Sequence, residues 1–260
     1  MRRTIILAVA ALMLGLSHLP AWGHDYWLMP RSFAPPPDTL LEVAFSCGHQ
    51  YFVNQSVPDL THFRAWLLLP GGRQMPLAWR RVTSNEAWLT VPLLGPGTYQ
   101  VCATTTAPEY WSRTAKGWRA GGKHQVPGAL ETGRYVKSTK TFLQVGRPSK
   151  DYRRLLGAEI ELVPLADPTT LKSGQTLPVR LWFRGRPLAG VEVMAVPRGF
   201  QPASHGQAPV KAKTDDKGTA RLKLEKPGTW LVFARHQIPT PGSPLADREN
   251  YRPYLLLELK

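Results

Sequence analysis

The chain has 260 residues, a formal net charge of +15, 25 prolines, 22 glycines and two cysteines. This length suits two domains of ordinary size, and the many turn-forming residues argue against a protein built from long helices. The 33 Lys and Arg residues are scattered and form no nucleic-acid-binding signature, so we expect no nucleic-acid partner. We interpret the net positive charge as serving solubility and attraction to anionic membrane surfaces.

Residues 1–23 have the pattern of a cleaved signal peptide. Two arginines precede an apolar run over 5–16, and Ala21 and Gly23 place small residues at −3 and −1 of a cleavage site. A cut after Ala21 is the alternative, but it puts Leu19 at −3. No cysteine is available there for a lipid, and no later segment has the length of a membrane helix. We therefore expect a soluble exported protein, most simply periplasmic, and not an integral membrane protein once processed.

Cleavage after Gly23 makes His24 the first residue of the mature chain. An N-terminal histidine offers its α-amine and its imidazole, which together can chelate one metal ion. Nickel and copper favour such nitrogen ligands. The cleavage site therefore predicts half of a metal site at His24.

A first domain is expected over 24–146. Short apolar runs alternate with Pro- and Gly-containing turns, as at 66–69, 86–91 and 99–102, which favours a β-sandwich. The pattern fails over 108–133, where we expect a long irregular loop. Loops of this length in compact domains are usually functional or disordered.

Residues 147–157 are polar and basic and are interpreted as a linker to a second domain over 158–260. Two-residue periodicity recurs there between tight turns, as at 177–183 and 219–224. The chain is thus predicted to be all-β, with two sandwich domains of immunoglobulin-like or transthyretin-like type.

Cys47 and Cys102 each end a strand-like run. In an oxidising compartment an even number of cysteines favours one disulfide, so we expect these two to be bridged. The alternative is a thiolate ligand, because Cys47 lies two residues before His49.

The mature histidines show no close pair such as H-x-H, so zinc-protease and zinc-finger spacings are absent. His49 and His236 each follow a predicted strand, where a rigid sandwich usually carries its sites. His124 lies in the irregular loop. His62 and His205 have no supporting context and are interpreted as surface residues.

No nucleophile elbow, phosphate-binding loop, dinucleotide fingerprint or paired catalytic acids stand out. Four of the nine tryptophans, Trp66, Trp88, Trp182 and Trp230, lie in strand runs and are interpreted as core residues. Trp27, Trp111 and Trp118 are expected to be available for ligands.

Several short motifs follow one another in the order found in a known family. They begin with the mature start 24–30 and Gly48-His49-Gln50, and continue with Tyr135-Val136-Lys137, 156–165, Pro187 to Val191, Thr214 to Gly218 and Ala234-Arg235-His236. The sequence thereby resembles exported proteins of a domain-of-unknown-function family, some of which are described as NikM-like or NikK-like periplasmic components of nickel or cobalt uptake. The resemblance implies two β-rich domains and a divalent-metal site with the N-terminal histidine as a ligand. By position it carries over to His24, His49 and His236.

The sequence thus predicts a periplasmic protein that binds Ni²⁺, or Co²⁺ or Cu²⁺, for uptake or handling, with an inner-membrane permease as its partner. His24 and His49 would be ligands, and His124 or His236 would complete or flank the site. A protein of this kind is not an enzyme. The alternatives are a copper-dependent enzyme that cleaves polysaccharides oxidatively through an N-terminal histidine brace, and a structural or adhesion module.

Overall fold

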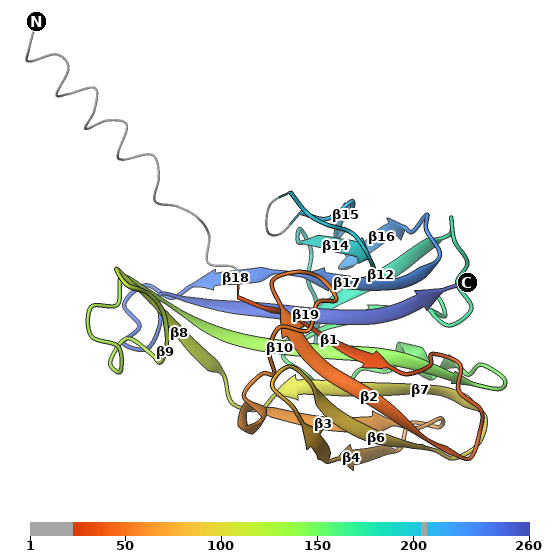
Figure 1. The fold of residues 1–260 in the computed structure, drawn as a ribbon. Coiled ribbons are helices and arrows are strands. Elements are labelled where there is room, and N and C mark those ends of the chain that lie inside the picture. Colours follow the sequence, from red (N-terminus) through yellow and green to blue (C-terminus); the bar gives the residue numbers. More distant parts are fainter. Residues whose placement is uncertain (1–22, 204–206) are drawn as a thin grey trace, which may run out of the picture.

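A computed structural model describes residues 23–203 and 207–260, so the predicted signal peptide lies, apart from Gly23, outside the described residues. Its regular structure is almost entirely β, which confirms the all-β prediction. Three sheets are stacked in layers (Figure 1). Within the described residues no helix has the length and apolar character needed to cross a membrane.

The first outer sheet comes entirely from the N-terminal half of the chain. Its four strands lie in the order β1 (Asp25–Pro30), β2 (Thr39–Gly48), β6 (Ala87–Leu93) and β5 (Trp79–Val82). The other outer sheet comes from the C-terminal half and comprises β11 (Ile160–Pro164), β12 (Thr176–Phe183), β13 (Arg186–Pro187) and β16 (Thr219–Lys223).

The middle layer is an eleven-stranded sheet to which both halves contribute. Its main path runs β15 (Val210–Lys213), β14 (Glu192–Pro197), β17 (Gly228–Ala234), β19 (Arg248–Leu259), β10 (Glu131–Val145), β7 (Gly97–Thr105), β3 (Phe63–Leu68) and β4 (Gln74–Leu77). Strand β18 (His236–Pro239) lies beside β19, and the hairpin β8 (Glu109–Thr114) and β9 (Gly117–Ala120) extends from β10. The two predicted sandwiches thus share their middle layer. The predicted linker 147–157 falls between β10 and β11 and contains the 3-10 turn η2 (Lys150–Arg153); a second such turn, η1 (Leu60–His62), precedes β3.

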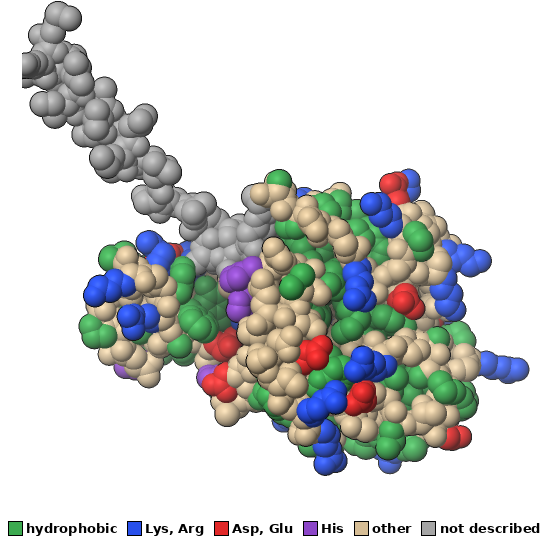
Figure 2. Space-filling view, viewed as in Figure 1, with side chains coloured by type: hydrophobic (Ala, Val, Ile, Leu, Met, Phe, Trp, Pro, Cys, Tyr) green, Lys and Arg blue, Asp and Glu red, His purple; other side chains and the backbone are tan. Residues whose placement is uncertain are grey.

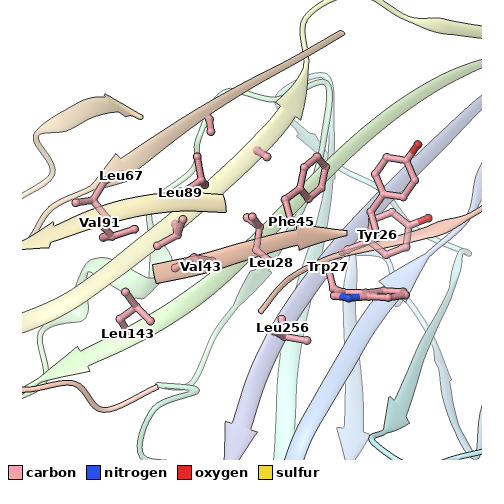
Figure 3. Packing of buried hydrophobic residues seen from close by; sticks show 14 of the residues in the cluster. Tyr26, Trp27, Leu28, Val43, Phe45, Leu67, Leu89, Val91, Leu143 and Leu256 are labelled. Atoms are coloured by element: carbon pink, nitrogen blue, oxygen red, sulfur yellow. The ribbon is translucent and has the colours of Figure 1, made fainter. Parts of the chain in front are cut away.

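Two hydrophobic cores lie on opposite faces of the middle sheet, because side chains alternate along each strand. On β17, Leu231 and Phe233 enter the first core, and Trp230 and Val232 enter the second. The first core fills the space under β1, β2 and β6, as Figure 3 shows for ten labelled side chains including Phe45.

The same alternation overturns the predicted disulfide. Cys47 and Cys102 are both free and buried. Cys47 belongs to the first core, as do Val101 and Ala103, which flank Cys102 on β7. Cys102 therefore points to the opposite face of the middle sheet, and the sheet separates the two sulfurs.

A buried ion pair fastens the predicted linker to the middle sheet. Lys140 on β10 and Glu161 on β11 are each 1% exposed, with Lys140 Nζ 3.1 Å from Glu161 Oε2. The Glu161 carboxylate also accepts hydrogen bonds from the backbone N–H groups of residues 156–158. Removing one partner of such a pair leaves the other charge uncompensated in the interior.

We therefore predict that Lys140→Met lowers the free energy of unfolding by about 3 kcal/mol, measured by urea denaturation. The control is Lys211→Met, which removes an exposed ion pair to Glu192 of similar length, 3.2 Å. That change should cost less than about 1 kcal/mol. Equal effects of the two substitutions would contradict the structural role of the buried pair.

We further predict that the unfolded protein, prepared without reductant, contains two free thiols per chain. The measurement is a thiol titration in denaturant, because both sulfurs are buried in the folded state. A chain without free thiols would show that the cysteines are bridged.

Candidate functional site

The pairing of β1 with β2 brings two predicted ligands together. The strands are antiparallel, and Asp25 lies opposite Gly48. The next position in the same register places His24 opposite His49. The centroids of the two imidazole rings lie 4.3 Å apart, with 65° between the ring planes. Two residues that are distant in the sequence therefore form a cross-strand histidine pair.

A short loop after β2 fixes the position of His49. The backbone N–H of His49 donates to Gln55 Oε1 at 2.6 Å, and Ser56 N donates to the Cys47 carbonyl at 3.2 Å. A side chain at Gly48 would meet the Val53 carbonyl at 2.5 Å, so only glycine fits there. The loop is thus folded back against the end of β2, with the exposed His49 at its base.

The inner side of the half-buried His24 faces a thiol and a hydroxyl. His24 Nδ1 lies 3.4 Å from Cys47 Sγ and 3.3 Å from Ser56 Oγ. The Cys47 thiol donates to the Ser56 carbonyl at 3.3 Å. Burial raises the pKa of Cys47 to about 11, with the Ser56 hydrogen bond acting in the opposite direction. Cys47 is therefore a neutral thiol near neutral pH.

Buried charged groups anchor the chain immediately after His24. Asp25 is fully buried and accepts from Arg235 Nη2 at 3.0 Å and from the Tyr254 hydroxyl at 3.0 Å. The ion pair ties β1 to Arg235, the residue that follows β17. The start of β1 is thereby held by the middle sheet.

A second buried pair supports Tyr26. Lys137 Nζ donates to the Tyr26 hydroxyl at 2.6 Å and to Glu109 Oε2 at 2.7 Å. Lys137 and Glu109 are 4% and 9% exposed at their side chains. Burial lowers the pKa of Lys137, and the charge of Glu109 acts against this shift.

The histidine pair opens into a small aromatic cavity of about 180 Å³, lined by Gly23, His24, Tyr26, His49, Trp111, Trp118, Tyr135 and Lys137. Trp111 lies opposite Ala120 and Trp118 opposite Arg113, so the two tryptophans are diagonal neighbours on one face of the β8–β9 hairpin. Both are more than a third exposed although they are large and apolar. Figure 2 shows histidine side chains between this projecting hairpin and the main body.

The first half of the predicted irregular loop 108–133 is instead an ordered hairpin over 109–120, and β8 pairs with β10. The expectation that Trp111 and Trp118 are available for ligands agrees with their position in the cavity wall. The same expectation is wrong for Trp27, which is 1% exposed and donates through its indole N–H to Asn54 Oδ1 at 2.9 Å.

The structure does not bring the other predicted histidines to this pair. His236 lies opposite Tyr251 and packs against Phe183 of the second core, so it is on the other face of the middle sheet. His124 is exposed in the loop after β9. His62 Nδ1 lies 2.9 Å from the Ala107 carbonyl oxygen, and His205 is outside the described residues. Within 23–203 and 207–260, no group of three or more His, Cys, Asp and Glu side chains is arranged to hold a metal ion.

Sequence reasoning missed the charged residues that hold the site. Their signal is a charged residue inside an apolar strand run, because such a residue must be paired when the strand is buried on both faces. Lys137 and Arg252 are buried within strands and fit this description, whereas Arg235 directly follows β17.

The environment keeps the His24 imidazole neutral. Burial is the largest cause, followed by His49 and Lys137, and together they lower its pKa from 6.5 to about 4. The unfolded chain takes up a proton near pH 6.5 and the folded chain only near pH 4, so this group makes the folded state less stable as the pH falls through that window. An α-ammonium group at a processed N-terminus would lower the pKa further.

We predict that NMR titration of the metal-free protein shows the His24 ring signals unchanged between pH 8 and pH 5.5, and moving only near pH 4. A His24 titration midpoint near 6.5 would show that the ring is solvated and not held against Cys47 and Ser56.

Among solved structures, the chain is similar to a DUF4785 family protein of Legionella pneumophila at 11% identity, a TM-score of 0.28, and coverage of 80% of this chain and 51% of that chain. It therefore spans about half of that protein. It is also similar to the D0–D1 domain of intimin (14% identity, TM-score 0.22, coverage 90% and 97%) and to the Escherichia coli adhesin FdeC (13% identity, TM-score 0.27, coverage 92% and 66%).

No curated protein matches the sequence, and no catalytic family is indicated. A family model does match across residues 21–238, from just before the histidine site to strand β18. The chain therefore belongs to the DUF4198 family, whose description is a domain of unknown function.

Proposed function

We propose that this protein is exported, is cleaved after Gly23, and then binds a divalent transition-metal ion through His24 and His49. The observation that carries the proposal is the cross-strand pairing of these histidines, 4.3 Å apart at their ring centroids, at the predicted cleavage point. Two imidazoles and a new α-amine supply three nitrogen donors, and chelation by the His24 amine and its own ring uses Nδ1, which must turn from Cys47 and Ser56 toward the ion. Nitrogen donors favour Ni²⁺ and Cu²⁺ over harder ions, and Co²⁺ is also compatible.

The arrangement around the pair supports binding in three ways. The low pKa of His24 keeps its ring free of a proton, which a metal ligand requires. Asp25 and Tyr26 hold β1 through buried partners, so the backbone of β1 is already ordered before the ion binds. The loop hydrogen bonds at Gln55 and Ser56 hold the strand end that carries His49.

Nitrogen ligation is favoured over a thiolate ligand at Cys47. The thiol is held as a hydrogen-bond donor to Ser56, and its pKa of about 11 makes loss of its proton costly near neutral pH. We propose that the metal is bound for uptake or handling, with an inner-membrane permease as recipient and Ni²⁺ as the first candidate. This part rests on the resemblance to NikM-like and NikK-like proteins; the match to DUF4198 supports the family and not that branch.

The copper-enzyme alternative is less well supported by the shape of the site. A polysaccharide-cleaving enzyme needs an extended surface along which a sugar chain can lie. Here Trp111 and Trp118 wall a cavity of about 180 Å³ beside the histidines. A structural or adhesion module, by contrast, would bind no metal, whether or not its signal peptide had been removed.

The test is calorimetric titration of Ni²⁺ into processed protein whose first residue is confirmed as His24 by intact mass. We predict tight binding of one ion. His49→Ala should lower the affinity by at least about 100-fold, because removing a ligand costs more than removing a residue that only hydrogen-bonds a ligand, which costs ~10- to 100-fold. The same loss is expected for unprocessed protein, in which the His24 nitrogen is an amide.

His62→Ala is the matched control, because it removes an imidazole that lies against Ala107 instead; its affinity should be unchanged. Cys47→Ser should also keep one bound ion. Equal binding by processed and unprocessed protein would remove the amine from the site, and full binding by His49→Ala would refute the histidine pair.

A further inference from the structure

Positive side chains outnumber carboxylates around the cavity beside the histidine pair, although only Lys137 among them lines it. Asp25 is paired with Arg235, and Glu109 is paired with Lys137. Arg252 is only 2% exposed, and the carboxylate whose charge acts on it is Asp25, which is already paired with Arg235. Arg235, Lys137 and Arg252 thus share two carboxylates, and because a buried charge that is incompletely compensated is unfavourable, this position is suited to an anion.

Arg252 hydrogen-bonds Tyr254 and its guanidinium carbon lies 5.2 Å from the Tyr135 ring centroid, but a further partner is one that processing would remove. Arg252 Nη1 donates to the Gly23 carbonyl oxygen at 2.9 Å. Gly23 also lines the cavity. Cleavage after Gly23 takes away this acceptor, enlarges the cavity and leaves a guanidinium donor directed to the vacated space. The Gly23 carbonyl therefore marks a place where a ligand oxygen is accepted.

The cavity walls are suited to a flat ring. Trp111 and Trp118 present apolar faces from the hairpin, and Tyr135 lies on the neighbouring strand β10. Gly133 makes room there, because a Cβ at this position would lie 2.8 Å from the Tyr135 ring. A volume of about 180 Å³ is several times the ~30 Å³ that a water molecule takes up in the liquid. A metal ion alone would leave most of it to water.

The charge of the metal is a second reason to expect an anionic ligand. A divalent cation bound at His24 and His49 would lie near Lys137 and Arg252, and each of these repels it. Three nitrogen donors also leave coordination positions open. An anionic chelator answers both requirements, because its charge offsets the cations and its donor atoms fill the open positions.

We infer that the processed protein takes up its metal as a complex with a small planar organic carboxylate, with the ring against Trp111 and Trp118 and the carboxylate accepting from Arg252. This inference rests on the proposed metal site and on cleavage after Gly23. Picolinate (pyridine-2-carboxylate) is a suitable test compound, because it combines an aromatic ring, one carboxylate and a nitrogen–oxygen chelating pair.

The experiment compares Ni²⁺ alone with a preformed 1:1 Ni²⁺–picolinate complex on processed protein, by calorimetry and by gel filtration with measurement of retained nickel and picolinate. We expect nickel and picolinate to be retained with the protein. The complex should bind about tenfold more tightly than Ni²⁺ alone, a factor within the ~5- to 150-fold range by which one bound ligand typically changes the affinity for another. Picolinamide, which keeps the ring and lacks the charge, should give no such gain.

The variants separate the carboxylate site from the metal site. Trp118→Ala should bind Ni²⁺ alone as well as the parent and lose the picolinate gain. Trp182→Ala is the matched control, a partly buried tryptophan of β12 outside the cavity, and should keep the gain. Arg252→Gln should also lose the picolinate gain. Because Arg252 is buried, the result for Trp118→Ala decides the matter if Arg252→Gln does not fold.

Retention of nickel with release of picolinate would overturn the inference and leave the metal site standing. So would a gain that survives both Trp118→Ala and Arg252→Gln. Failure to bind either Ni²⁺ or the complex would instead refute the metal site itself, and with it the inference.

Discussion

The parallel pairing of β10 with β19 is the interaction on which the rest of the molecule depends. Nine residue pairs, from Gly133 with Arg248 to Thr141 with Leu256, join strands more than a hundred residues apart. Parallel neighbours require a long connection, and here that connection contains the whole second outer sheet. Because both faces of this pair are covered, each strand supplies side chains to two cores, and charged residues on it must find partners.

The histidine site follows from this constraint. Strand β1 crosses the face of β10 and β19 that bears Lys137, Arg252 and Tyr254, as Figure 1 shows for the strands. Tyr26 is held by Lys137, and Asp25 by Tyr254 and Arg235, so the chain is anchored from Asp25 onward. An N-terminal histidine is ordinarily free to move. Here the register of β1 on β2 and the buried charges beneath it fix His24 opposite His49.

Much of this could be predicted from the sequence, and the failures have physical causes. The strands and the all-β class follow from local patterns of apolar residues and turns, and the predicted cleavage site drew attention to His24, which the structure places beside His49. The disulfide prediction failed because the compartment and the number of cysteines do not show on which face of a sheet each side chain lies. Cys102 points away from Cys47, on the opposite face of the middle sheet. His236 failed for the same reason, since alternation places it with Tyr251 and not with Arg252.

Other features depend on long-range pairing that no local pattern contains. The segment 108–133 lacks regular periodicity, yet it forms a hairpin because β10 continues far enough to pair with β8. Trp27 was expected to be accessible, but Asn54 satisfies its indole N–H inside the protein. The sharing of a middle sheet by the two halves depends likewise on β10 meeting β19, which is a property of the whole chain.

The most direct test of this account is a crystal structure of the processed protein grown with Ni²⁺, with diffraction measured on both sides of the nickel absorption edge. We predict one anomalous peak, bonded to the His24 α-amine and to the imidazoles of His24 and His49. A peak at His124 or His236, or no peak at the start of the chain in nickel-saturated crystals, would contradict the claim that strand register assembles a metal site at His24.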